Sequence, residues 1–169
     1  TDQALRNEHQ ILNAIIEHFP SGVSVIDAAL RITKRNGKLR SLLNLPDDLA
    51  SEPIDLESVV RFTAEHGEYG AVDVDTYVAE AMERARNREP HCFERTRPNG
   101  TVLEIKGAPL PEGGFVTSYT DITERKQAEA RIGRLLDEQR LIFDNAHVGI
   151  VWVCQRVILR CNKRMADMF

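Results

Sequence analysis

Histidine, cysteine and paired acidic residues are the side chains of this sequence that could perform chemistry. The sequence has five histidines and three cysteines. The cysteine count is odd and no two cysteines form the C-x-x-C spacing of metal and redox pairs, so neither a disulfide framework nor a zinc site is predicted. Asp73 and Asp75 could begin a calcium loop, but the glycine and glutamate of such a loop are missing, and helix capping explains the pair better.

Catalytic motifs are absent from the sequence. It contains no Gly-rich phosphate loop and no nucleophile elbow. His9 lies in a Glu-His-Gln triplet without the motif that surrounds the phosphoacceptor of a histidine kinase, and the Glu-Gly-Gly-Phe stretch that ends at Phe115 is interpreted as a hairpin turn. We therefore predict that this chain is not an enzyme and that a catalytic effector belongs to another part of the parent protein.

Composition limits the class of protein further. Hydrophobic residues make up 42% of the 169 residues, which is enough for a packed core, and the net charge is −4. A nucleic-acid partner is not predicted, because both signs of charge are interspersed and no basic patch stands out. The longest apolar run, 148–154, is far shorter than the roughly 20 residues that cross a bilayer. We predict a cytoplasmic location and no membrane contact within this chain.

The first half of the chain predicts helices around one hairpin. Residues 2–19 repeat apolar side chains every seven positions, which indicates a helix with coiled-coil character. Two β-branched runs within residues 23–33 predict the hairpin, and Asn36 is expected to cap a short helix after it. Two further helices are predicted within residues 54–87.

The next part of the chain predicts consecutive strands. Residues 91–97, 101–108 and 115–120 are separated by Asn99-Gly100 and Gly113-Gly114, which are typical hairpin turns. Together with the early hairpin they predict an α+β fold, in which helices cover one face of a five-stranded antiparallel sheet and further helices flank it at both ends.

A cavity between the sheet and its helices would be lined by inward-facing strand residues. In the last strand we expect the face that carries Phe115 to point inward. The predicted lining residues are Val25, Ile32, Phe93, Leu103, Ile105, Phe115, Thr117 and Tyr119. The alternative from the same residues is a filled core with no cavity.

Asp121 ends the last strand almost directly before a charged helix. With Glu124 three residues later, it has the arrangement of a capping box, which would set the direction of the helix. That helix is predicted to run to about Asn145. Its seam consists of two sets of positions, 125, 132, 139 and 146, and 128, 135 and 142. This spacing favours a parallel dimer over a solvated linker helix, because apolar side chains in a seam need a partner.

A family resemblance is carried by two stretches, SGVSVIDAALRITKRNGKLRSLL and FERTRPNGTVLEIKGAPLPEGGFVTSYTDITERK. Residues 19–123 resemble a PAS domain, the sensory module of bacterial signalling proteins. The resemblance implies that Asp121, Ile122 and Thr123 tie the last strand to the output helix. It also implies that Asp121 pairs with an arginine of a neighbouring strand, for which Arg95 and Arg97 are the candidates.

The cofactor of such a domain is left open by the residues. Haem-binding relatives use an axial histidine on a helix near the sheet, and none of the histidines here is expected on an inward helical face. Flavin photoreceptor relatives need a cysteine within a helical motif, whereas Cys92 begins a strand. Haem and flavin are therefore not predicted, and no cofactor is required by the sequence.

An internal repeat defines the predicted domains. Residues 147–169 echo the opening of the PAS-like segment, with Gly149 matching Gly22 and Asn162 matching Asn36. We predict an N-terminal helix at 1–19, a PAS domain at 20–123, a linker or coiled-coil helix at 124–146 and the truncated start of a second PAS domain at 147–169. Residues 148–159 are expected to be poorly ordered or docked on another surface, because two strands cannot bury their apolar face alone.

These observations favour a sensory module of a bacterial signalling protein, of the histidine kinase (two-component) or diguanylate cyclase (cyclic-di-GMP) type. It would transmit the binding of a small molecule or partner through the Asp-Ile-Thr junction to a dimeric output helix. The expected partner is a second copy, held through the N-terminal and linker helices. The alternative is a dimerisation spacer with a filled core and no small-molecule ligand.

Overall fold

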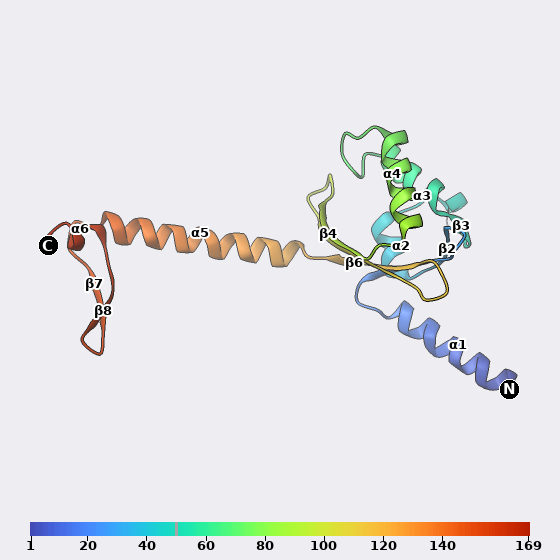
Figure 1. Ribbon diagram of the computed structural model, residues 1–169, viewed down its shortest axis with the longest axis horizontal. Coiled ribbons are helices and arrows are strands. Elements are labelled where there is room, and N and C mark those ends of the chain that lie inside the picture. The colour runs from blue at the N-terminus through green and yellow to red at the C-terminus, as the bar shows by residue number, and fades with distance from the viewer. Residues whose placement is uncertain (50) are drawn as a thin grey trace. The chain divides into compact units, whose positions relative to one another are not determined.

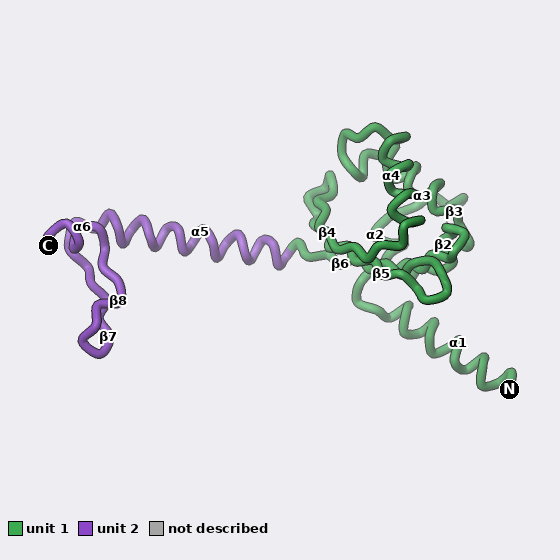
Figure 2. The backbone as a smooth tube through the Cα atoms, in the orientation of Figure 1, with its two compact units in different colours: residues 1–123 green, residues 124–169 purple. Residues whose placement is uncertain are grey.

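The structure is a computed structural model that describes residues 1–49 and 51–169. The chain forms two compact units, residues 1–123 and residues 124–169, which Figure 2 shows in different colours. Each unit has its own sheet and its own helices.

Unit 1 contains one six-stranded antiparallel sheet with the strand order β3-β2-β1-β6-β5-β4. Its strands are β1 (Gly22–Ile26), β2 (Arg31–Arg35), β3 (Ile54–Asp55), β4 (His91–Thr96), β5 (Val102–Pro109) and β6 (Phe115–Asp121). Its helices are α1 (Asp2–Glu17), α2 (Gly37–Leu43), α3 (Leu56–Glu65) and α4 (Val74–Asn87), with a short 3-10 turn at Asp47–Leu49. The predicted α+β fold is confirmed, and α3 and α4 lie over one face of the sheet (Figure 1).

The sheet has one strand more than predicted. Residues Ile54 and Asp55 were assigned to a helix, but Ile54 pairs with Ile32 as the edge strand β3. The helix starts two residues later than predicted, at Leu56, because Asp55 is its N-cap, with the carboxylate accepting a 3.0 Å hydrogen bond from the Ser58 amide. A two-residue strand has no periodicity of its own, so only its pairing with β2 reveals it.

The core of unit 1 lies between the sheet and the helices. Its buried cluster combines side chains from five elements and consists of Ile26, Ile32, Ile54, Val59 and Phe115, against which Leu45, Leu49 and Leu56 pack. The predicted inward face of β6 is borne out, because Phe115 and Thr117 are buried whereas Val116 and Ser118 are only partly covered.

Asn36 joins the start of unit 1 to its sheet. The side chain is fully buried. Its Oδ1 accepts hydrogen bonds from the amides of Val23 (2.9 Å) and Leu39 (3.0 Å), which makes it the predicted cap of α2. Its Nδ2 donates to the carbonyls of Ser21 (2.9 Å) and Ile16 (3.0 Å). One amide group therefore holds the end of α1, strand β1 and the first turn of α2.

Unit 2 begins with the helix α5 (Thr123–Asn145), whose first residue is the last residue of unit 1. A hairpin of β7 (Val151–Cys154) and β8 (Val157–Cys161) and the short helix α6 (Lys163–Ala166) follow it. The hairpin is formed, and its apolar side chains are exposed: Trp152, Val153, Val157, Ile158 and Leu159. These side chains are the surface that the predicted docking would cover.

The three cysteines, Cys92, Cys154 and Cys161, are exposed. Cys92 lies between two residues of β4 that face inward, so its side chain points to the opposite face of the sheet. In residues 1–49 and 51–169, no three His, Cys, Asp or Glu side chains gather where they could hold a metal ion. Within the same residues, no helix has the length and apolar character needed to span a membrane.

Candidate ligand cavity and exit junction

A cavity of about 150 Å³ lies between the helix-covered face of the sheet and the helices α3 and α4. The sheet contributes eight of its lining residues, Ile26, His91, Phe93, Arg95, Ile105, Phe115, Thr117 and Tyr119. The helices and the loop between them contribute the rest, Leu56, Val60, Tyr69, Tyr77, Ala81, Arg84 and Ala85. Two alanines of α4 are among them, and their small side chains leave the space open.

Five of the eight residues predicted to line a cavity come together in this one. They are Phe93, Ile105, Phe115, Thr117 and Tyr119. The other three lie elsewhere. Val25 precedes Ile26 on β1 and therefore faces the opposite side of the sheet. Ile32 belongs to the buried cluster beside β3. Leu103 is fully buried but does not line the cavity.

The sequence prediction missed most of the polar and aromatic lining. Tyr69, Tyr77, Arg84, His91 and Arg95 were not expected there. Alternation along β4 could have placed His91 and Arg95 on the face that carries Phe93, because residues two apart share a face. Tyr77 and Arg84 lie seven residues apart on α4, which is also a same-face spacing. The loop residue Tyr69 has no such periodic signal.

Aromatic rings form two walls of the cavity. Tyr69 and Tyr77 stack with their ring centroids 4.2 Å apart. His91 stacks on Phe115 at 5.6 Å and contacts Phe93 at 5.8 Å. The His91 ring lies directly over Gly107, the residue opposite it on β5, where a side chain would clash with the ring. The absence of a side chain at Gly107 therefore leaves room for the His91 ring.

Tyr119 and Tyr77 of the cavity stay protonated near neutral pH. Desolvation by burial raises the pKa of Tyr119 to about 12, and the neighbouring Tyr69 acts in the same direction. Burial likewise raises the pKa of Tyr77, although a hydrogen bond from Arg84 opposes the shift. These phenols are therefore neutral groups that can donate a hydrogen bond.

The exit from the sheet is held by hydrogen bonds on both sides of Ile122. The Ile122 amide donates to the Val102 carbonyl (2.9 Å), and the Val102 amide donates to the Thr123 hydroxyl oxygen (3.0 Å). The Thr123 hydroxyl and amide in turn donate to the Asp121 carboxylate at 2.6 and 3.0 Å. Ile122 itself is buried, so the single residue between β6 and α5 is anchored by packing as well.

Asp121 acts differently from the predicted capping box. Because α5 begins at Thr123, the carboxylate accepts from the amide two residues ahead and not from Glu124. The hydrogen bond from the Thr123 hydroxyl is the main reason that the pKa of Asp121 lies below its usual range, and the Thr123 amide adds to it.

The expected ion pair between Asp121 and Arg95 or Arg97 is not formed. Arg97 pairs with Glu68, and Arg95 lies over the ring of Tyr69, 4.6 Å from its centroid. The strand order explains this difference. Strand β5 separates β4 from β6, and Leu103 stands between Arg95 and Asp121 in the register, so their backbones are roughly 10 Å apart.

Comparisons with known proteins agree with this fold and define its class. A family model described as a PAS fold matches residues 16–130, more than half of the chain. The chain belongs to the PAS family. A second model, described as a PAS domain, matches residues 138–169, which include the hairpin of unit 2. A search of curated proteins gave no match.

Several solved structures are similar to the chain at low sequence identity. The PAS domain of Bordetella pertussis BvgS has 17% identity and a TM-score of 0.52, with 78% of this chain and 98% of that chain covered. A domain of a sensory box sensor histidine kinase/response regulator from Geobacter sulfurreducens has 23% identity and a TM-score of 0.46, with coverages of 69% and 96%. The PAS domain of an HTR-like protein from Haloarcula marismortui has 19% identity and a TM-score of 0.47, with 72% of this chain and 97% of that chain covered. At these identities the likeness concerns the fold.

Proposed function

We propose that residues 20–123 are the sensory domain of a signalling protein and that the occupant of the cavity controls the helix α5. The observation that carries the proposal is the position of Tyr119. Its side chain lines the cavity, and two residues later the same strand enters the hydrogen-bonded junction of Asp121, Ile122 and Thr123. A change at the cavity wall therefore has a short covalent path to the start of α5.

The physical basis of the signal is a shift between two arrangements of the junction. A ligand can drive such a shift only if it binds one arrangement more tightly than the other. The Thr123 hydroxyl is well suited to report the change, because it accepts from Val102 and donates to Asp121 at the same time. Moving β6 against β5 would break one of these two hydrogen bonds.

The output element in this proposal is a parallel homodimer through α1 and α5. Apolar side chains on α1 are exposed, namely Leu5, Ile11, Leu12, Ile15 and Phe19 near its end. The α5 seam positions Ile132, Leu135 and Ile142 are likewise exposed. Packing these side chains across a dimer would remove them from water. The 23 residues of α5 would then extend over roughly 34 Å toward residues 147–169.

The effector that this module regulates would be a histidine kinase or a diguanylate cyclase in the parent protein. This part of the proposal rests on the family, because PAS domains regulate enzymes of both kinds. In it, the segment at 147–169 is the beginning of a second PAS domain, and α5 connects the two domains.

Spin labels on α5 test the coupling directly. The three cysteines are replaced by serine, Arg131→Cys carries the label, and the distance between the two copies is measured by pulsed EPR. Ala81→Leu partly fills the cavity and should shift the distance distribution. Ala79→Leu, an exposed position on the same helix, is the matched control and should not.

Thr123→Val completes the test, because it removes the hydroxyl and keeps the shape of the side chain. The shift caused by Ala81→Leu should disappear in the Thr123→Val background. If the filled cavity leaves the distance distribution unchanged with Thr123 intact, the proposed coupling is wrong.

A dimerisation spacer is the second candidate function. It is favoured by the size of the cavity, which at about 150 Å³ is below the roughly 300 Å³ at which sites for drug-sized ligands begin. Native mass spectrometry separates the two candidates. A dimer that retains a small molecule supports the sensor, whereas a dimer of bare chain mass supports the spacer.

A further inference from the structure

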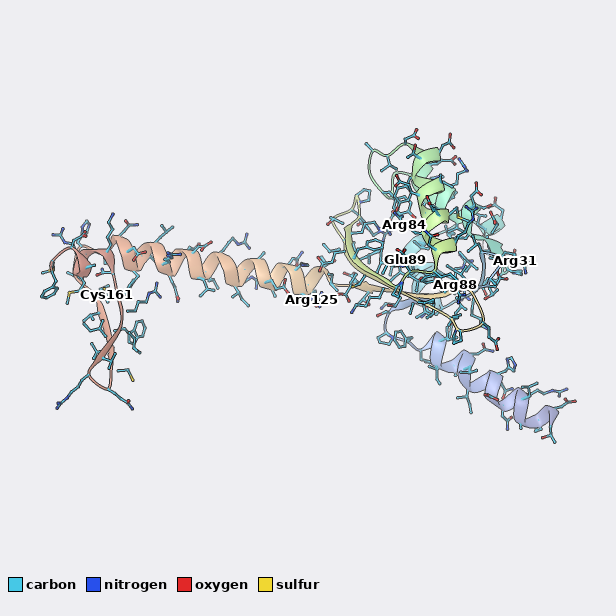
Figure 3. All side chains as sticks on the ribbon, in the orientation of Figure 1. Arg31, Arg84, Arg88, Glu89, Arg125 and Cys161 are labelled. Carbon is cyan, nitrogen blue, oxygen red and sulfur yellow. The ribbon has the colours of Figure 1, made fainter. Side chains whose placement is uncertain are left out.

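The charge of the cavity lining is one-sided. Two of its lining residues, Arg84 and Arg95, are cationic, and none is an aspartate or glutamate. Arg84 extends from α4 (Figure 3) and is largely exposed, so it belongs to the rim. Arg95 is half-buried and comes from the sheet. A cavity of this composition favours an anion over a neutral or cationic ligand.

Arg95 lacks the compensation that other covered arginines of unit 1 have. Arg35 donates to the carbonyl of Leu49 at 3.0 Å and pairs with Glu52 at 3.4 Å, and Arg97 pairs with Glu68. For Arg95, no carboxylate partner exists among residues 1–49 and 51–169, and its buried Nε has no hydrogen-bond partner within that part of the chain. The face of the Tyr69 ring is its main contact. Covering a cation without a partner is unfavourable. An anion that pairs with Arg95 would therefore stabilise the site.

The strand register places this cation at one end of the cavity. Arg95 is opposite Leu103, which is opposite Asp121. His91, at the other end of β4, is opposite Gly107 and in line with Thr117. The charged end of the cavity is therefore the end near the exit junction, and the end near Phe115 is apolar and aromatic.

The size and walls of the cavity define the rest of the ligand. A cavity of about 150 Å³ has room for a group the size of one benzene ring. The stacked pair Tyr69–Tyr77 and the pair His91–Phe115 present ring faces and edges, against which a flat group packs favourably. Haem and flavin, which have several fused rings, exceed this volume.

We propose that the cavity binds a small planar carboxylate, an aromatic monocarboxylate of about the size of benzoate. Its carboxylate pairs with the Arg95 guanidinium, and its ring lies toward His91 and Phe115. This inference rests on the proposed function in that the cavity is the sensory site, and it adds the chemical class of the ligand. The neutral phenols of Tyr77 and Tyr119 supply further donors for the carboxylate.

Isothermal titration calorimetry of the full chain with benzoate tests the proposal, with benzyl alcohol as the neutral analogue and inorganic phosphate as the anion without a ring. We expect benzoate to bind at least tenfold more tightly than either. Arg95→Met should weaken benzoate binding by at least tenfold and leave benzyl alcohol unaffected. Arg31→Met removes the same charge from the exposed first residue of β2 and is the control that should bind normally.

Thermal melting separates a binding role of Arg95 from a structural one. Without ligand, Arg95→Met should melt at the same temperature as the parent chain or above it, because methionine removes a half-buried charge that has no carboxylate partner in the part of the chain that the structure describes. A lower melting temperature, with benzoate binding retained, would show that Arg95 supports the fold and would overturn the proposal.

The remaining outcomes distinguish this inference from the proposed function. Equal affinity for benzoate and benzyl alcohol would overturn the anionic ligand and keep the sensory cavity. Phosphate binding as tightly as benzoate would overturn the aromatic ligand. If none of the three probes binds and native mass spectrometry finds bare chains, both the inference and the sensory function are wrong.

Discussion

The same asparagine arrangement occurs in both units of the molecule, with different surroundings. Asn162 is fully buried like Asn36, and its Oδ1 accepts from the amides of Ile150 (2.8 Å) and Met165 (3.0 Å). Its Nδ2 donates to the carbonyl of Val148 at 2.9 Å. These partners correspond to Val23, Leu39 and Ser21 in unit 1, so the two hairpins and their helix caps are built alike.

The difference between the two regions is in what covers the strands. In unit 1 the hairpin continues into a six-stranded sheet, and Ile32 of β2 is 4% exposed. In unit 2 the hairpin is a sheet of two strands, and the matching Ile158 of β8 is 63% exposed. The hairpin and the cap therefore depend on local hydrogen bonds, whereas burial depends on strands and helices from distant parts of the chain.

The largest effect is expected at the asparagines. Asn36→Ala leaves two amides and two carbonyls of unit 1 without partners, which should lower the free energy of unfolding by about 4 kcal/mol. Urea unfolding followed by circular dichroism measures it. The matched variant Asn162→Ala should leave the main transition within about 0.5 kcal/mol, because its partners lie in the other unit. Equal losses from both variants would contradict the separation of local and global roles.

The next effect concerns the matched isoleucines. Ile32→Ala removes buried methyl and methylene groups from the core and should cost about 3 kcal/mol. Ile158→Ala should change the free energy of unfolding by less than about 0.5 kcal/mol, because the side chain is already in water. A large loss from Ile158→Ala at high chain concentration only would show that a second copy covers this strand.

A smaller effect is expected at the matched glycines. A Cβ on Gly22 would lie 3.2 Å from both Cα and Cβ of Leu39, so Gly22→Ala should cost roughly 1–2 kcal/mol through overpacking. A Cβ on Gly149 would meet the Sδ atom of Met165 at 2.9 Å. That atom belongs to a flexible side chain that can move, and the Met165 Cα lies slightly farther away, at 3.3 Å, so Gly149→Ala should cost less. Chemical denaturation of each variant provides the comparison, and an equal cost at both glycines would count against it.

The smallest effect is a pH dependence that belongs to one hairpin turn. Hydrogen bonding from the Arg31 amide, and then the charge of Arg31, hold the pKa of Asp27 below its ordinary value, so the carboxyl titration followed by NMR should have its midpoint below about 3.9. Because the folded pKa is the lower one, the stabilisation is present above the unfolded value and is lost as the pH falls through the folded pKa. The other turn has Gln155 and Arg156 at its centre and no carboxylate. Asp27→Asn should remove the dependence, and a dependence that persists would place its origin elsewhere.

Features that depend on neighbouring residues were predictable from the sequence. Asn36 was expected to cap α2 and does so, and Asn99-Gly100 was expected to turn the chain and does so with Gly100 in the left-handed region. The repeat that relates Asn162 to Asn36 was also visible, because the same residues recur at nearly constant separation. Hydrogen bonds over a few residues and the conformational freedom of glycine determine all of these.

The tertiary structure alone decided which side chains meet across the sheet. The family resemblance made Arg95 one of two candidates for the junction, but the insertion of β5 between β4 and β6 separates it from Asp121 and leaves it at the cavity. The strand β3 and the place of Tyr69 were hidden for the same reason. Strand order and register join residues that are far apart along the chain, and no local pattern records how strongly each pairing competes with the others.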